Sequence, residues 1–351
     1  MSENPRWKRR PEGSTWGDFG PDDQLGRLNL ITPAKVLQGI AEVKEGRSFC
    51  LSLPLDYPGG NVLNPRRYPP VLRPTLRNGQ PNFNFRLGTI EPDRTDIVSD
   101  DLVVMHTQYS TQWDSLAHVG QLFDDDGDGE PEAVYYNGYR AEQDVVGPSG
   151  GDEAGHTGTI RAESTSGAKA LGIEGMAAHG VQGRAVMLDL LHHFGPGRTV
   201  VGYAQLRQVL DADRIVVEEG DMVCLRTGFS DALLAMNHNP SPSVMETAGA
   251  VLDGRDPDLL RWITDSGLSI LAADNYAVEA HPAVSHPGCC AALPLHEHCL
   301  FKLGVHLGEI WHISPLADWL REHGRYRFLL TAPPLRLPGA VGSPATPIGT
   351  V

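Results

Sequence analysis

Residues 110–118 read STQWDSLAH and place an amide, a carboxylate and an imidazole within seven positions. On a β-strand, residues two apart share a face, so Gln112 and Asp114 would point the same way. If the chain turned into a helix after Asp114, His118 would lie one turn on and could return to the carboxylate. Aspartate is a hard ligand for a divalent ion, and a nearby imidazole could move a proton to or from a bound water. The spacing also fits an Asp that caps a helix beside a partly exposed His, so both interpretations stay open.

A second group of candidate ligands lies in LPLHEHCLFKLGVHLGEIWH, residues 293–312, which holds four of the 14 His residues of the chain. Neutral imidazole is the usual nitrogen ligand for zinc and similar ions. His296 and Glu309 are thirteen positions apart, and they could meet if a helix over 296–303 turned at Gly304 into a strand. Helix capping and simple surface exposure would explain these His residues equally well.

Three other motifs carry weaker signals. FDDDGDGE at 123–130 resembles the start of a calcium loop, but Tyr135 stands where a bidentate Glu is needed, so we expect an acidic solvated turn. GVQGR at 180–184 lacks the spacing of a nucleotide-binding loop, and we expect a turn before a strand. HTGT at 156–159 has no Asp or second His nearby, so we assign it no role.

The elements that must position these residues alternate between two periodicities. Capped, amphipathic segments predict helices over 32–46, 203–213 and 256–267. Apolar runs predict buried strands over 184–191, 221–229 and 268–275. Strands that alternate with helices indicate an α/β fold.

The irregular segments suggest how the chain is organised. Residues 54–100 are rich in Pro, Asn, Arg and Gly, and loops of this length are usually functional. A second small-residue stretch covers 147–168, and the Pro/Gly-rich tail from Pro333 is expected to lie extended over the surface. The expected parts are an N-terminal arm and helix (1–60), a single main catalytic domain (61–335) and an extended C-terminal tail (336–351).

Composition excludes several classes of function. The chain has 351 residues and a net charge of −15, and acidic chains repel phosphate backbones, so we expect no nucleic-acid partner. No apolar run approaches the roughly 20 residues of a membrane helix, and we expect no membrane partner. No apolar segment follows the basic start MSENPRWKRRPEG, which favours a cytoplasmic protein. Five Cys residues without C-x-x-C spacing predict neither a disulfide framework nor a thiolate zinc site.

Several stretches, in order, resemble the cyclase-like metal-dependent hydrolases, a family that includes kynurenine formamidase, isatin hydrolase and trans-dienelactone hydrolase. The similar stretches are WGDFGPDDQLGRLNLITP (16–33), GRAVMLDL (183–190), GDMVCLRTGF (220–229), ADNYAVE (273–279) and LPLHEHCLFKLGVHLGE (293–309). The resemblance covers most of the chain and implies a swivelling β/β/α fold. It also implies a homodimer or homotetramer in which the N-terminal segment wraps a neighbouring subunit.

The metal motif of that family, H-x-G-T-H-x-D-x-x-x-H, falls on Gln108, Gln112, Asp114 and His118, with Thr111 at the position of its Thr. Two metal-binding His residues of the family are therefore Gln in this chain. An amide oxygen is a weaker ligand for zinc than imidazole, so the first of two metals is expected to be weak or absent. Gln112 would be an oxygen ligand or orient water, and Gln108 is a further candidate ligand.

The resemblance implies that the second metal keeps its ligands as Asp114, His296 and Glu309. His298 competes with His296, and His106 is an alternative ligand two residues out of register. We therefore expect one zinc or manganese ion per chain.

The implied reaction is hydrolysis of an amide or lactone bond in a small molecule by a metal-activated water, with His118 as general acid/base. Trp113 and Thr111 are expected beside the substrate, and Arg66, Arg67 or Arg86 could bind a substrate carboxylate. The alternatives are a metal-dependent lyase or cyclase and a non-catalytic homologue that binds a small molecule.

Overall fold

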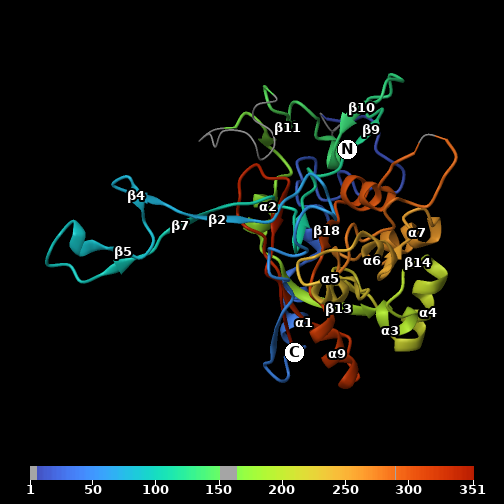
Figure 1. Cartoon of the computed structure of the whole chain (residues 1–351). Coiled ribbons are helices and arrows are strands. Elements are labelled where there is room, and N and C mark those ends of the chain that lie inside the picture. The colour runs from blue at the N-terminus through green and yellow to red at the C-terminus, as the bar shows by residue number, and fades with distance from the viewer. Residues whose placement is uncertain (1–5, 151–163, 289) are drawn as a thin grey trace.

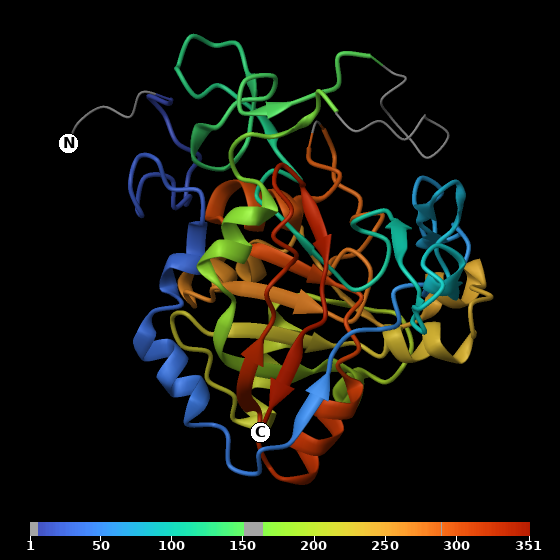
Figure 2. The ribbon, with the colours of Figure 1, turned by 90° about the vertical axis from the view of Figure 1, so that its left-hand side faces the viewer.

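The computed structural model describes residues 6–150, 164–288 and 290–351, so the HTGT motif lies outside the described residues. Within these residues, nine strands form one curled sheet with helices on both faces (Figures 1 and 2). In spatial order the strands are β1 (Ser48–Cys50), β21 (Ile348–Thr350), β19 (Arg327–Thr331), β13 (Gln182–Asp189), β15 (Met222–Arg226), β17 (Ile270–Ala273), β18 (His306–Glu309), β8 (Gln112–Asp114) and β20 (Gly342–Pro344). The central strands β13, β15, β17 and β18 are parallel, and antiparallel strands flank them.

Helices and short ribbons surround this sheet. The helices are α1 (Pro33–Ile40), α2 (Ile173–His179), α3 (Leu190–Phe194), α4 (Tyr203–Asp213), α5 (Phe229–Ala235), α6 (Pro242–Thr247), α7 (Pro257–Asp265), α8 (Pro294–His296), the π-helical η5 (Glu297–Leu303), α9 (Ser314–Glu322) and the 3₁₀ turns η1 (Gly26–Leu30), η2 (Leu87–Thr89) and η3 (Tyr136–Gly138). The paired ribbons are β2 (Val71–Pro74) with β7 (Asp101–Val104), β3 (Leu76–Arg77) with β4 (Gln80–Pro81), β5 (Phe85–Arg86) with β6 (Ile97–Val98), β9 (Gln121–Phe123) with β10 (Glu132–Val134), β11 (Val145–Val146) with β12 (Gly167–Ala168), and β14 (Thr199–Val201) with β16 (Ala250–Leu252).

The central strands are apolar on both sides because each face of the sheet is covered. Leu188 and Leu225 belong to a core that includes residues of α4 and α7, whereas Met187 and Cys224 belong to a core that includes residues of α2 and α9. Strands covered on both faces read as continuous apolar runs instead of an alternating pattern. The predicted α/β architecture is confirmed.

The predicted helices differ in how well their ends match. The helix over 203–213 coincides with α4, and Asp256 caps α7 as its position suggests. Thr32 caps α1, but that helix ends at Ile40 and not at 46. The chain makes turns between Ile40 and the sheet because it must enter β1 at Ser48.

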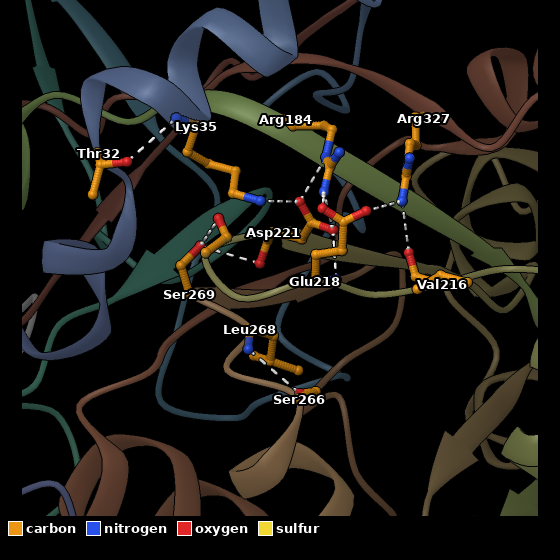
Figure 3. Close-up of polar contacts among 11 residues, drawn as sticks. Thr32, Lys35, Arg184, Val216, Glu218, Asp221, Ser266, Leu268, Ser269 and Arg327 are labelled. Carbon is orange, nitrogen blue, oxygen red and sulfur yellow. Dashed lines mark hydrogen bonds and ion pairs between the residues drawn. The ribbon is translucent and has the colours of Figure 1, made fainter.

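A buried ion-pair network joins α1 to the amino ends of β13 and β15 (Figure 3). The Asp221 carboxylate is fully buried and lies 3.1 Å from Lys35 Nζ and 2.8 Å from Arg184 Nε. Glu218 lies 2.7 Å from Arg184 Nη2 and also contacts Arg327. Because cations surround each carboxylate, the network holds α1 on the sheet without an unpaired charge.

The C-terminal tail differs from its expected arrangement. The tail does not lie loosely over the surface, since β20 pairs with β8 and β21 pairs with both β1 and β19. The described part of the N-terminal segment packs against its own chain, with Trp16 fully buried and its indole donating to the Phe301 carbonyl, and its contact with a neighbouring subunit stays a prediction. Backbone pairing, which needs no apolar pattern, explains how a Pro-rich tail enters the sheet.

Residues 71–104 form an arm that leaves the body of the molecule (Figure 1). Its stem is the β2–β7 ribbon, whose residues are all exposed, including Leu72 and Val103 as a cross-strand pair. The expected long irregular segment therefore contains short ribbons. In the described part of the chain, no helix is long and apolar enough to cross a membrane.

Candidate metal centre

Strands β8 and β18 bring three polar side chains to one face of the sheet. Gln112 lies opposite Glu309 in the antiparallel register, and Asp114 lies opposite Leu307. Residues directly opposite on antiparallel strands share a face, and alternation puts Asp114 on that face as well. Trp113 points to the other face, where its ring lies 4.9 Å from that of Trp311.

His296 reaches the same place from α8. The chain then passes through η5, turns at Gly304 with a φ of 61° and enters β18, as the sequence predicts. His296 Nδ1 lies 2.7 Å from Glu279 Oε1, and the backbone N–H groups of Leu295 and His296 donate to the same carboxylate. Its other ring nitrogen, Nε2, lies 3.2 Å from Glu309 Oε1.

Three ligand groups therefore converge in the interior. Ligand atoms of Asp114, His296 and Glu309 all lie within 4.8 Å of one another, and all three residues are buried. Asp114 Oδ2 is buried and makes no hydrogen bond. With Glu279, three carboxylates surround one imidazole, an excess of negative charge that a divalent ion would balance. The donor set fits zinc or manganese.

The pKa values reflect this crowding. Burial raises the pKa of Asp114, although His118 and His296 act against that rise. Burial also disfavours the charge on Glu309, but the hydrogen bond and positive charge of His296 outweigh it and lower the pKa of Glu309. Burial opposes protonation of His296 as well, yet hydrogen bonds to Glu279 and Glu309 raise its pKa to about 10. A metal ligand must be deprotonated, so an ion at this site would displace the His296 proton.

Both Gln residues of the motif touch these carboxylates through their amide nitrogens. Gln112 Nε2 donates to Glu309 Oε2 at 2.9 Å, and Gln108 Nε2 donates to Asp114 Oδ1. Gln108 Nε2 also lies 3.1 Å from His118 Nδ1. An amide nitrogen only donates, so Nδ1 accepts and the proton of neutral His118 lies on Nε2. Nε2 lies 3.9 Å from Asp114 Oδ1, and the His118 side chain is 22% exposed.

The alternative ligands lie apart from this cluster. His298 Nε2 is 2.9 Å from Thr264 Oγ1 on α7, and burial lowers the pKa of His298 to about 4. His106 is half-buried and contacts the backbone of Tyr68. Asp124, Asp126 and Asp128 form the other described group of potential ligands, in an exposed turn where they bind backbone N–H groups. Only Asp114, His296 and Glu309, among the described residues, combine His with carboxylates at this spacing.

Two residues expected beside the substrate have no exposed surface. The Trp113 indole donates to the Ala332 carbonyl, within the core on the far face of the sheet. Thr111 Oγ1 donates to the Ile310 carbonyl and accepts from the backbone of Leu53. Neither residue is therefore placed to contact a substrate. Alternation along β8 puts Trp113 on the face opposite to Gln112 and Asp114, and both hydrogen bonds of the Thr111 hydroxyl join neighbouring loops.

Two other polar residues matter more than their sequence pattern suggested. Glu279 holds His296, but the sequence offered only its place in ADNYAVE, after a buried strand. Arg67, one of three candidate carboxylate binders, donates from Nη1 to the Gln108 carbonyl at 2.6 Å. Arg66 lies in the same loop, and Arg86 is exposed on β5 in the arm. Of the three, Arg67 is the one that contacts a residue of the site.

Solved structures share this architecture. A structure described as a novel cyclase is 29% identical, covers 96% of this chain and 97% of its own, and has a TM-score of 0.72. Isatin hydrolase A from Labrenzia aggregata, bound to benzyl benzoate, is 12% identical and covers 86% of this chain and 93% of its own, with a TM-score of 0.52. Isatin hydrolase A from Ralstonia solanacearum is 13% identical and covers 91% of this chain and 97% of its own, also with a TM-score of 0.52. At such identity the isatin hydrolases show a common fold.

Sequence comparison gives the family. No curated protein matches the sequence. The model of a family described as "Putative cyclase" matches residues 50–280, which is more than half of the chain. The solved cyclase structure has the same fold as this chain, in agreement with the family match. The chain therefore belongs to the putative cyclase family.

Proposed function

We propose that this protein is a hydrolase that cleaves an amide or lactone bond in a small molecule with the help of one zinc or manganese ion. Asp114, His296 and Glu309 would hold the ion. The observation that carries the proposal is the convergence of their ligand atoms within 4.8 Å in a buried cluster with an excess of negative charge. The fold shared with isatin hydrolases supports hydrolysis as the reaction class.

The ion would supply a Lewis acid that polarises a carbonyl and lowers the pKa of water. His118 would move the proton, because its ring is partly exposed beside Asp114. Gln108 sets the resting tautomer of His118, with the hydrogen on Nε2. Neutral His118 would take a proton from the attacking water, and the resulting imidazolium would give a proton to the leaving group. Glu279 orients His296 through Nδ1 and leaves Nε2 for the ion.

We infer one ion per chain because both Gln side chains act as hydrogen-bond donors. Gln112 directs its nitrogen to Glu309, and Gln108 directs its nitrogen to Asp114 and His118. The amide N–H groups of the two Gln residues orient the carboxylates of Asp114 and Glu309. A second ion would need atoms with lone pairs at the positions that these N–H groups occupy. A Gln108→His, Gln112→His double variant should therefore raise the metal content from about one ion per chain to about two.

Elemental analysis of the purified wild-type protein and an Asp114→Asn variant tests the proposal. We expect about one divalent ion per wild-type chain and none in the variant, since an amide cannot replace the buried anionic ligand. Two ions in the wild type would contradict the proposed role of the Gln residues. No ion after incubation with zinc and manganese would contradict the hydrolase and favour a non-catalytic homologue. A metal-loaded protein would then be screened on amides and lactones.

The family description favours a second candidate, a lyase or cyclase that uses the same residues. His118 would then move a proton without attack by water. Turnover in oxygen-18 water separates the two reactions. Hydrolysis puts the label into the product, whereas proton transfer with elimination or ring closure leaves the product unlabelled.

A further inference from the structure

A cavity of about 560 Å³ lies beside the metal centre. It is formed where β15 and β17 end, next to the β14–β16 ribbon, and α6 closes one side. The carboxyl ends of parallel strands are where α/β proteins usually bind ligands. A cavity of this volume suits an organic molecule of one or two rings.

The cavity and the metal centre share a wall. Glu279 lines the cavity and also holds His296 through Nδ1. Tyr276 lines the cavity and also a small neighbouring space of about 10 Å³ that Gln108 and Arg67 line. Because Gln108 contacts Asp114 and His118, Tyr276 stands between the cavity and the groups that would perform the reaction.

The lining specifies an uncharged ligand. Phe229, Met245 and Val251 are buried and apolar, and Glu279 is already engaged by His296. The charged side chains of Arg198 and Glu246 are exposed and therefore lie at the mouth. A charged group placed deep in this cavity would lose its hydration without a partner.

Tyr276 carries a hydroxyl group at the border between the cavity and the small neighbouring space, because Tyr276 lines both and Asn64, which the hydroxyl contacts, lines the small space. Its hydroxyl oxygen accepts from Asn64 Nδ2 at 3.2 Å, and Asn64 is itself buried and fixed by the Arg66 N–H on its Oδ1. A hydroxyl that accepts from Asn64 keeps its own hydrogen for another acceptor. A carbonyl oxygen is an acceptor of the kind that an amide or lactone carries.

We propose that this cavity holds an uncharged, ring-bearing part of the substrate, and that Tyr276 is a specificity residue whose hydroxyl donates to an oxygen of that substrate. The substrate class is thus an aromatic or alicyclic carbonyl compound whose ring carries no charge. The proposal rests on the proposed function for the reaction that follows binding, but binding itself requires no turnover.

Two probes of nearly equal shape test the donor. 2-Acetylnaphthalene has a carbonyl oxygen where 2-isopropenylnaphthalene has a methylene group. Both would be titrated into the full-length protein by ligand-observed NMR. We expect saturable binding of both, with the ketone bound about tenfold more tightly. Tyr276→Phe should remove that tenfold preference and leave the affinity for the hydrocarbon unchanged.

Variants that fill the cavity test the site. Met245→Trp puts an indole into it, and Val284→Trp narrows it from an exposed position that carries little risk of misfolding. Each should weaken binding of both probes at least tenfold. Val244→Trp is the matched control, because Val244 lies on the same helix as Met245 but is exposed and outside the cavity lining.

Each outcome decides the proposal. Absence of saturable binding, or unchanged binding in folded Met245→Trp and Val284→Trp proteins, would overturn the cavity as a binding site. An equal loss of both probes in Tyr276→Phe would overturn the donor role of Tyr276. The metal content of the same wild-type protein separates this proposal from the hydrolase: if the protein binds the probes but takes up no metal, only the hydrolase is contradicted.

Discussion

Two buried clusters of charge lie at opposite ends of the parallel strands and are built differently. At the amino end, Asp221 lies between Lys35 and Arg184, so its charge is matched. At the carboxyl end, Asp114 and Glu309 share one imidazole with a third carboxylate, Glu279. Both clusters are buried, so burial alone does not distinguish structure from function. The difference teaches that a matched cluster serves the fold, whereas an unmatched one requires a ligand.

The largest effect is expected at the matched cluster. Asp221→Asn would leave Lys35 buried without a countercharge and Arg184 with Glu218 alone, and should lower the free energy of unfolding by about 3–5 kcal/mol. Urea unfolding monitored by circular dichroism measures this loss. The folded fraction should still bind one metal ion. A loss below 1 kcal/mol would show that the network does not hold α1 as described.

The second prediction concerns His306, a buried imidazole whose pKa no neighbouring carboxylate raises. His306 lies on β18, and burial, followed by the charge of His179, lowers its pKa to about 3. The unfolded chain protonates this ring near pH 6.5, so folding stability is lost as the pH falls below that value. Between pH 8 and pH 5 the loss attributable to His306 should be about 2 kcal/mol.

His306→Leu isolates that contribution. Unfolding in urea at several pH values, with EDTA present to keep the protein free of metal, should show a shallower pH dependence in the variant. Other buried groups, such as His298, titrate in both proteins and cancel in the comparison. Equal slopes in the two proteins would mean that His306 is not buried in its neutral form.

The third prediction tests the cluster at the carboxyl end of the strands by removing the carboxylate of Glu279, which supports the metal site. Glu279→Gln removes the carboxylate that orients His296, and metal affinity should fall about 10-fold to 100-fold. Competition with a chelator measures the affinity. Glu297→Gln is the matched control, because Glu297 is adjacent to His296 but contacts Lys302 instead. Equal metal affinities in the two variants would show that Glu279 does not support the metal site.

The smallest effect has the opposite sign to the first. Burial raises the pKa of Asp114, so its ionised form opposes folding at neutral pH when no metal is bound. Asp114→Asn should therefore stabilise the metal-free protein by about 1 kcal/mol while metal binding is lost. Thermal unfolding with EDTA provides the measurement. Destabilisation comparable to that of Asp221→Asn would break the distinction between the two clusters.

Local pattern was enough to predict some of these features. Gln112 and Asp114 share a face because side chains alternate on a strand, and Gly304 marks the turn between η5 and β18. The sequence could not choose between His296 and His298, because the choice depends on how α8 and η5 rotate their side chains.

Non-local pairing accounts for what was missed. Strands β20 and β21 hold their places through backbone hydrogen bonds to distant strands, which leave no apolar periodicity in a Pro-rich tail. The role of Glu279 likewise depends on His296, 17 positions away, and a lone carboxylate after a strand has no pattern of its own. The sequence predicted Trp113 beside the substrate because it does not reveal which face of the sheet Trp113 occupies. In the structure, Trp113 lies in the core on the other face.

The arm has a consequence for the continuity of the chain. The chain segments on either side of the arm are joined where Arg67 donates to the Gln108 carbonyl, and both segments belong to one sheet through β1 and β8. A single proteolytic cut among the exposed residues of the arm would yield two fragments. Such a cut would break few contacts, because the arm residues around it are exposed. The N-terminal fragment would stay bound through the pairing of β1 with β21 and the seat of Trp16. The nicked protein is in effect a stable complex of two peptides, and the metal centre would be carried whole by the larger one.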